Sequence, residues 1–171
     1  MPLFRTAQTP LQIVQPNYRT PLAGIVTTAM TLGALVEVKH SVVGDPLELV
    51  AANGGRPAFL ENPVLLDVDW QAYGKLDPQW LSDIRKPVPV GSGVSARFAH
   101  VVEVEGATLF TGIDANTAAG TPLKTAAGKF AIATVAIPSG GGTADRVIGY
   151  LTRLVPPADS TSFRWVIELI A

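Results

Sequence analysis

The sequence lacks cysteine and is poor in charge and in histidine, and each shortage excludes a class of function. Without cysteine, the chain has no disulfide, no thiolate metal ligand and no cysteine nucleophile. Charged residues make up 16% of its 171 residues, well below the roughly 25% of an average soluble domain. A surface with so little charge tends to self-associate or to be covered by partners. We therefore expect much of the surface to be engaged in contacts.

The basic residues are scattered, and the longest apolar stretch is interrupted. The formal net charge is −1, and Lys and Arg form no stripe that could neutralise phosphates. Residues 22–38 contain three threonines, two glycines and a glutamate, which is too polar for a membrane span. The first ten residues lack the apolar core of a signal peptide. We expect a soluble, unprocessed protein that binds neither nucleic acid nor membrane.

Short apolar runs separated by turn-forming residues predict an all-β fold. From Gly112 onward, such runs alternate with turns marked by Gly, Pro and Thr about every ten residues. Residues 121–134 predict a strand, a turn at Ala127-Gly128-Lys129 and a second strand. Residues 146–155 and 163–170 predict two further strands. The fold class that we predict is a small antiparallel β-barrel or sandwich with one short helix.

The first part of the chain adds strands, a reversal and that helix. Residues 34–39 alternate apolar with charged side chains, as a half-buried strand does. Asn53-Gly54-Gly55 predicts a tight reversal because Asn and Gly tolerate positive φ. Residues 78–86 predict the helix, since Asp77 suits an N-cap and a proline suits the first helical position.

A turn-rich stretch and a long strand follow. Residues 88–93 are rich in glycine and proline and are the best internal boundary. Residues 94–105 predict one long strand, and residues 108–110 predict its hairpin partner across Gly106.

The N-terminal residues predict an extended arm. We assign residues 1–21 to this arm and residues 22–171 to the β-domain, which the boundary at 88–93 would divide into two β-rich halves. Four prolines exclude a helix from the arm. Its hydrophobic residues are the predicted partner-binding residues: Leu3, Phe4, Leu11, Ile13, Val14 and Tyr18.

Two interpretations of this arm stay open, a disordered tail and a segment that docks on a neighbouring subunit. Burying the hydrophobic side chains does not by itself offset the entropy of ordering the backbone. The arm is ordered only if its backbone pairs with a strand edge or lies in a preformed groove on a partner. We predict an arm that is mobile in the isolated protein and ordered in an assembly.

No pattern in the sequence spells out a catalytic or metal site. His40 and His100 have no serine elbow nearby, and His100 lies on the apolar side of its strand, so we interpret it as an ordinary or interfacial histidine. Asp67 and Asp69 next to Trp70 leave three alternatives: a solvated strand edge, a weak cation site, or acid–base work on a sugar. We predict no catalytic residue, no metal and no cofactor.

Glycine clusters and aromatic residues have structural interpretations. Gly91-Ser92-Gly93 and Gly140-Gly141-Gly142 lack the residues that complete a phosphate-binding loop, so we interpret both as turns. We expect Phe163, Trp165 and Tyr150 to fill the core.

Three segments in the last third carry a resemblance to a known family. They are Ala119-Gly120-Thr121-Pro122-Leu123-Lys124, Ala127-Gly128-Lys129 and Ala144-Asp145-Arg146-Val147-Ile148-Gly149-Tyr150-Leu151. This succession resembles the small β-proteins that cement or decorate the capsids of tailed bacteriophages. The matching motifs consist of turn-forming residues and include no catalytic signature. Residues 22–86 have no counterpart in the family.

The resemblance implies a function without catalysis. Proteins of that family are compact β-barrels or β-tulips, often with an N-terminal arm, that sit as trimers on the capsid. The expected partner is the major capsid protein, the expected assembly is a homotrimer, and the expected location is the virion exterior after synthesis in the host cytoplasm. The alternatives are another virion or tail adaptor with a β-barrel, and a carbohydrate-binding β-sandwich that uses Asp67, Asp69 and Trp70.

Overall fold

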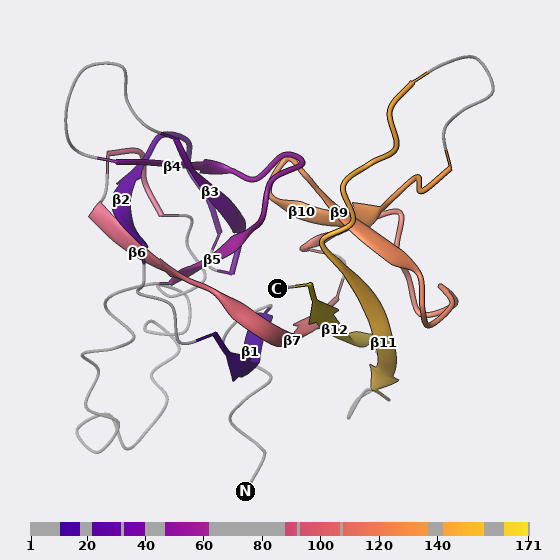
Figure 1. Cartoon of the computed structure of the whole chain (residues 1–171). Helices are drawn as coiled ribbons and strands as arrows, with labels where there is room; N and C mark the ends of the chain where they lie inside the picture. Colours follow the sequence, from indigo (N-terminus) through magenta and orange to yellow (C-terminus); the bar gives the residue numbers. More distant parts are fainter. Residues whose placement is uncertain are drawn as a thin grey trace, which may run out of the picture.

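The computed structural model has an all-β architecture. It describes residues 11–17, 22–31, 33–39, 47–61, 88–91, 93–106, 108–136, 142–155 and 163–170. Within these ranges the chain forms twelve strands and no helix (Figure 1). The helix predicted over residues 78–86 lies outside the described residues.

Seven strands form one sheet, in the order β1-β7-β12-β11-β9-β10-β8. Their bounds are β1 (Leu11–Pro16), β7 (Ala99–Glu105), β8 (Phe110–Thr111), β9 (Pro122–Ala126), β10 (Lys129–Ile132), β11 (Gly149–Val155) and β12 (Arg164–Leu169). Neighbouring strands are antiparallel except β8 and β10, which are parallel. The strands predicted around the turn at 127–129, within 146–155 and within 163–170 are therefore confirmed.

The other five strands close into a barrel, in the order β2-β4-β3-β5-β6 with β6 pairing back onto β2. Their bounds are β2 (Leu22–Val26), β3 (Leu35–Lys39), β4 (Glu48–Ala51), β5 (Ala58–Glu61) and β6 (Gly93–Arg97). The one parallel pair in this barrel, β2 with β4, depends on Gly24, because a Cβ there would lie 2.6 Å from the carbonyl oxygen of Leu47. Closure leaves none of these strands with an open edge.

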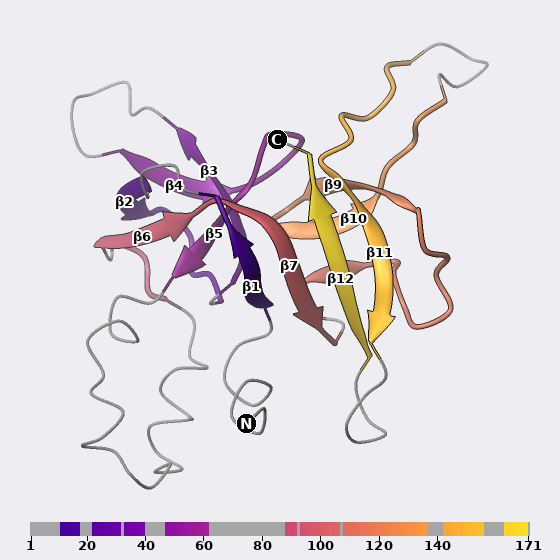
Figure 2. The same ribbon diagram turned by 60° about the horizontal axis from the view of Figure 1, so that its bottom comes forward.

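The chain passes from the barrel to the sheet at Phe98, where β6 ends and β7 begins. Figure 2 shows β6 and β7 following one another across this junction. The prediction of one long strand over residues 94–105 was wrong, because the strand is interrupted at Phe98: β6 pairs within the barrel and β7 pairs within the seven-stranded sheet. The N-terminal strands follow the same path: β1 pairs with β7, β2 pairs with β6, and the Asn17 N–H donates to the Phe98 carbonyl at 3.1 Å.

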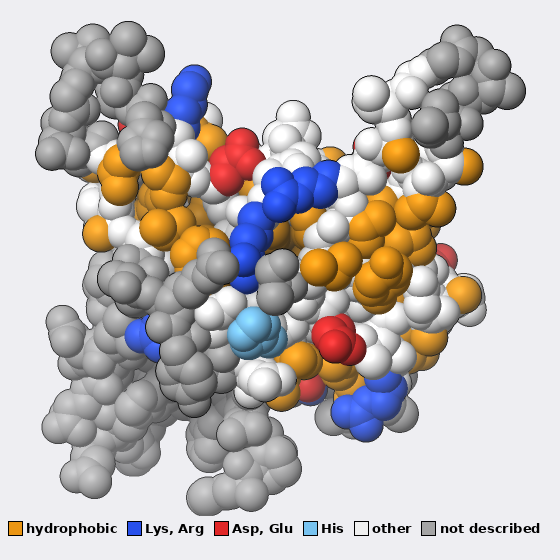
Figure 3. Space-filling view, in the orientation of Figure 1, with side chains coloured by type: hydrophobic (Ala, Val, Ile, Leu, Met, Phe, Trp, Pro, Cys, Tyr) orange, Lys and Arg blue, Asp and Glu red, His pale blue; other side chains and the backbone are white. Residues whose placement is uncertain are grey.

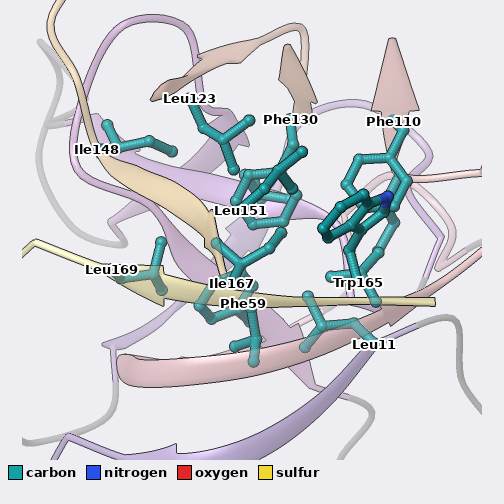
Figure 4. Packing of buried hydrophobic residues seen from close by; sticks show 14 of the residues in the cluster. Leu11, Phe59, Phe110, Leu123, Phe130, Ile148, Leu151, Trp165, Ile167 and Leu169 are labelled. Carbon is teal, nitrogen blue, oxygen red and sulfur yellow. The ribbon is translucent and has the colours of Figure 1, made fainter. Parts of the chain in front are cut away.

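A single hydrophobic cluster joins the barrel to the sheet (Figure 4). Leu35 and Phe59 of the barrel lie in the same cluster as Phe130 and Leu123 of the sheet, and all four are fully buried. The rings of Phe59 and Phe130 have centroids 6.3 Å apart, a distance typical of tilted aromatic pairs. A second cluster, which includes Leu49, fills the barrel interior. The two sheets therefore share a core.

The turn between β9 and β10 docks onto the barrel. Ala127 and Gly128 have φ values of 48° and 76°, the consecutive positive φ angles of a type I′ hairpin turn. The Gly128 N–H donates to the Ala52 carbonyl at 3.0 Å, and the Gly128 carbonyl accepts from the Leu35 N–H at 3.1 Å. A glycine is required here because a Cβ at this position would meet Ala51 and Leu35.

The predicted hairpin between residues 94–105 and residues 108–110 was wrong. Strands β1 and β12 occupy both edges of β7, so no edge is left for residues 108–110. Instead β8 pairs in parallel with β10, and Leu109 and Phe110 are buried in the shared core.

The prediction for the aromatic residues of the last strands was partly right. Trp165 is 2% exposed, and Phe163 packs against the core, with its ring 5.8 Å from that of Phe110. Tyr150 is 44% exposed, so the prediction that it fills the core was wrong. Tyr150 lies on the other side of its strand from Leu151, which is fully buried.

Candidate functional site

Three of the six predicted partner-binding residues lie in β1, at the edge of the seven-stranded sheet. Leu11 is 7% exposed and belongs to the shared core, Ile13 packs against that core, and Val14 is 54% exposed. Residues 11–16 therefore pair with a strand of their own chain, one of the two conditions under which the predicted arm is ordered. Leu3, Phe4 and Tyr18 lie outside the described residues.

The outer face of the sheet carries a row of cross-strand partners near the end of β12. Gln15 of β1 pairs with Val101 of β7, which pairs with Glu168 of β12. Glu168 pairs with Tyr150 of β11, which pairs with Pro122 of β9. Directly opposed residues point to the same side of a sheet. The row therefore combines an exposed aromatic ring with a carboxylate and an amide.

A hollow of about 570 Å³ lies over this row; we call it the tyrosine hollow, and its lining includes Gln15, His100, Tyr150, Glu168 and Ile170. His100 lies there because β7 has one residue more than β1 at this point: Gln15 pairs with Val101 and Pro16 pairs with Ala99. Such bulges re-aim side chains at a sheet edge. The ring of His100 has no hydrogen-bond or ion-pair partner within the described ranges.

A second hollow, of about 100 Å³, adjoins the first and contains two arginines; we call it the arginine hollow. It shares Leu169 and Ile170 with the tyrosine hollow, and Arg56 and Arg146 line it together with apolar residues. The guanidinium carbon of Arg56 lies 5.5 Å from the ring centroid of Phe98, in cation–π contact. Phe98 thus fixes one cation at the point where the barrel meets the sheet.

Arg146 is exposed, and the neighbouring carboxylate is bound elsewhere. Asp145 forms an ion pair with Lys124 at 2.9 Å and accepts a hydrogen bond from the Thr134 N–H at 2.7 Å. The hydrogen bond from Lys124 and that from Thr134 hold the pKa of Asp145 below its ordinary value. Arg146 has no ion pair with any part of the chain that the structure describes.

Figure 3 shows this face of the molecule, on which basic side chains border hydrophobic side chains, with acidic and histidine side chains close by. At the opposite end of this sheet face, charged side chains form ion pairs with one another. There Arg164 donates to Glu103 at 3.1 Å and to Glu105 at 3.4 Å, and all three side chains are at most one quarter exposed.

The other residues singled out from the sequence cannot be placed in a site. His40, Asp67, Asp69 and Trp70 lie outside the described residues. Within the ranges that the structure describes, no three side chains of the metal-ligating types come together. The same ranges contain no helix with the length and apolar character needed to span a membrane. No protein-family model and no curated protein matches the chain.

Sequence reasoning did not find the arginine hollow. Arg56 follows the turn after β4, Arg146 precedes β11, and Ile170 follows β12. Three separate segments meet there only through strand pairing, so no local spacing signals the site.

Proposed function

We propose that this chain is a non-enzymatic structural protein of a virion, which binds the outer surface of a tailed-phage capsid and cements neighbouring capsomers. The observation that carries the proposal is the position of the family-like segments. Residues 119–151 contain β9, β10 and the start of β11, and this same region carries the exposed hydrophobic residues Ile132, Val135 and Tyr150. The segments that resemble the family thus contribute exposed apolar residues to the surface.

Hydrophobic residues on an open surface support binding to a protein. Tyr150 and Ile170, which are 44% and 48% exposed, line the same hollow. Ile132, 45% exposed, is the cross-strand partner of the buried Leu123 and so points to the other face of the sheet. Grouped apolar residues that stay exposed are typical of interaction sites, whereas scattered ones are ordinary. A protein that touches several capsid subunits gains further, because each contact raises the effective concentration for the next.

The proposal includes the finer points that the resemblance implies. The partner is the major capsid protein, the assembly is a homotrimer, and the location is the capsid exterior. A β-tulip-like arrangement with an extended N-terminal arm over residues 1–21 and a short helix over residues 78–86 belongs to the same proposal.

Binding to capsid shells tests the proposed function. Purified full-length protein is mixed with emptied shells of the phage that encodes it, and bound protein is measured by co-sedimentation and located by electron cryo-microscopy. We expect saturable binding at a fixed ratio to the major capsid protein, with trimers at defined lattice positions. Absence of co-sedimentation at any protein concentration would sink the proposal.

A matched pair of variants separates specific binding from adhesion. Tyr150→Asp places a charge in the exposed apolar surface and should weaken shell binding, while Thr152→Asp changes an exposed residue of the same strand and should not. Thermal midpoints of both variants should stay close to that of the wild type, since both positions are exposed. Equal binding by the two variants contradicts a role for this surface.

A further inference from the structure

We propose that Asn53 is a site of spontaneous deamidation, which the docked β9–β10 hairpin keeps unreactive and which reacts when the hairpin leaves the barrel. The sequence contains one Asn-Gly pair, Asn53-Gly54, in the segment between β4 and β5. Asparagine is a chemically labile residue, and its lability depends on its neighbours. This chemistry needs no partner and is independent of the proposed function.

The reaction joins the side chain of Asn53 to the backbone of Gly54. The Gly54 backbone nitrogen loses its proton and attacks the Asn53 Cγ. A bond forms between these two atoms, and the Cγ–Nδ2 bond breaks to release ammonia, which leaves a succinimide ring. Water then opens the ring. Cleavage of the new N–Cγ bond gives aspartate, and cleavage of the original backbone C–N bond gives isoaspartate.

Asn53 and Gly54 have the exposure and the side chains that this reaction requires. Both residues are exposed, and a Cβ at Gly54 would have no neighbouring heavy atom within 4 Å. Glycine leaves the attacking nitrogen unshielded because it carries no side chain. The Asn53 side chain has no hydrogen bond with the part of the chain that the structure describes. The other asparagines precede Tyr18, Pro63 and Thr117, whose side chains or missing N–H hinder the same attack.

Thr125 of β9 holds the attacking nitrogen. The Gly54 N–H donates to the Thr125 hydroxyl at 2.7 Å and to the Thr125 carbonyl at 3.2 Å. The same hydroxyl donates to the Gly55 carbonyl at 3.3 Å, and Thr125 is buried. Two acceptor oxygens thus face the proton that the reaction must remove, and a nitrogen that keeps its proton is a poor nucleophile. The Gly54 nitrogen is therefore unreactive while the hairpin is docked.

Deamidation consequently requires local opening of the hairpin from the barrel. The neighbouring contacts are the backbone hydrogen bonds of Gly128 with Ala52 and Leu35. A few hydrogen bonds at one junction open more often than the whole protein unfolds. When such opening is fast relative to the chemistry, the reaction rate follows the population of the open form. Modification of Asn53 then records how often the hairpin undocks.

The isoaspartate product opposes redocking. Isoaspartate routes the main chain through the Cβ and Cγ of residue 53, which lengthens the backbone between Ala52 and Gly54. The Ala52 carbonyl accepts from the Gly128 N–H, and the Gly54 N–H donates to Thr125, so both neighbours of residue 53 hold the hairpin. An added backbone atom moves these two contacts out of register. Undocking followed by deamidation is therefore a one-way step.

Ageing of the full-length protein tests the site. Native protein and protein in concentrated urea are kept at mildly alkaline pH, and deamidation is followed by mass spectrometry after cleavage at glutamate. Cleavage after Glu48 and Glu61 gives a peptide whose one asparagine is Asn53, and the peptide that contains Asn116 is the internal reference. We expect Asn53 to react faster than Asn116 in urea, and at least about tenfold more slowly in native protein than in urea. Equal rates in native and unfolded protein, or no advantage over Asn116 in urea, overturn the proposal.

Thr125 variants assign the protection to this contact. Thr125→Val removes the hydroxyl and should speed deamidation of Asn53 in the folded protein about fivefold or more. Thr125→Ser retains the hydroxyl and should leave the rate close to that of the wild type. Leu11→Ala is the second control, because it alters the shared core without touching the Gly54 N–H. No acceleration in Thr125→Val overturns the proposal. Equal acceleration in Leu11→Ala also overturns it, since global unfolding would then explain the result.

Hydrogen exchange of the Gly128 amide tests the one-way step. Aged protein enriched in isoaspartate at residue 53 is compared with Asn53→Asp, which carries the same added charge on an unaltered backbone. We expect the Gly128 amide to exchange about tenfold faster or more in the isoaspartate form, and at a rate near that of the wild type in Asn53→Asp. Equal exchange rates in the two forms overturn the one-way step.

Discussion

Truncation of Leu11 tests whether β1 belongs to the folded core or is a detachable arm. The Leu11 side chain is 7% exposed and lies in the cluster that joins barrel and sheet. Its surroundings are tight, since a Cβ added at Gly33 would lie 2.9 Å from the Cβ of Leu11. Buried leucines replaced by alanine lose about 2–5 kcal/mol, and a position in an edge strand suggests the lower half of that range.

The expected result for Leu11→Ala is a loss of about 3 kcal/mol in the free energy of unfolding. For a domain of this size, that corresponds to a fall of about 6–12 °C in the thermal midpoint. Urea denaturation and differential scanning calorimetry of the full-length protein measure the two quantities. The m-value should stay unchanged, because the surface exposed on unfolding is nearly the same.

Val14→Ala is the matched control for Leu11→Ala. Val14 lies in the same strand but is 54% exposed, so its truncation should change the free energy of unfolding by at most about 0.5 kcal/mol. If both variants lose equally little stability, the reasoning is refuted: β1 would then rest on the domain without contributing to its core, as a mobile arm does.

Three further variants test single contacts by chemical denaturation. Gly149→Ala should lower the free energy of unfolding by about 1–3 kcal/mol, because the new methyl group would meet the backbone carbonyl of β12. Gly93→Ala should lower it much less, because a Cβ at Gly93 would have no neighbouring heavy atom within 4 Å. Thr125→Val should lower the free energy of unfolding by about 1–3 kcal/mol, because the buried Thr125 hydroxyl accepts a hydrogen bond from the Gly54 N–H at 2.7 Å and so links the hairpin to the barrel. An unchanged free energy of unfolding would mean that a water molecule replaces the Thr125 hydroxyl. Asp145→Asn should lower the free energy of unfolding at neutral pH. Because the pKa of Asp145 is depressed in the folded protein, the stability difference between wild type and variant should be complete above about pH 4 and should vanish as the pH falls through the lowered pKa. A stability difference that does not depend on pH contradicts the ion-pair explanation.

Local chemistry explains what could be predicted from the sequence. The turn at Ala127 and Gly128 is fixed by residues that tolerate positive φ, and the flanking alternation sets the faces of β9 and β10. The all-β class follows from such patterns along the chain. These features depend on neighbours within a few residues, which a single sequence displays.

Pairing between distant segments explains what could not be predicted. The break at Phe98 falls inside an unbroken apolar alternation, and it is imposed by the two sheets that β6 and β7 enter. The exposure of Tyr150 depends on which face of the sheet covers the shared core, and alternation alone does not decide that. For the same reason Arg56 and Arg146, which lie 90 positions apart, carried no signal of a common hollow.

The placement of β7 between β1 and β12 sets the order in which the molecule can be completed. These neighbours are the first and the last strands of the described chain, so β7 gains its second hydrogen-bonded partner only after residues 164–169 have left the ribosome. Until then one margin of β7, with its alternating valines, stays open to other nascent chains. The barrel, whose strands all lie before residue 98, can close earlier. During synthesis from the N-terminus, the barrel can therefore close before the seven-stranded sheet is complete. The strands that pair last are far apart in the sequence, which makes completion of the sheet slow.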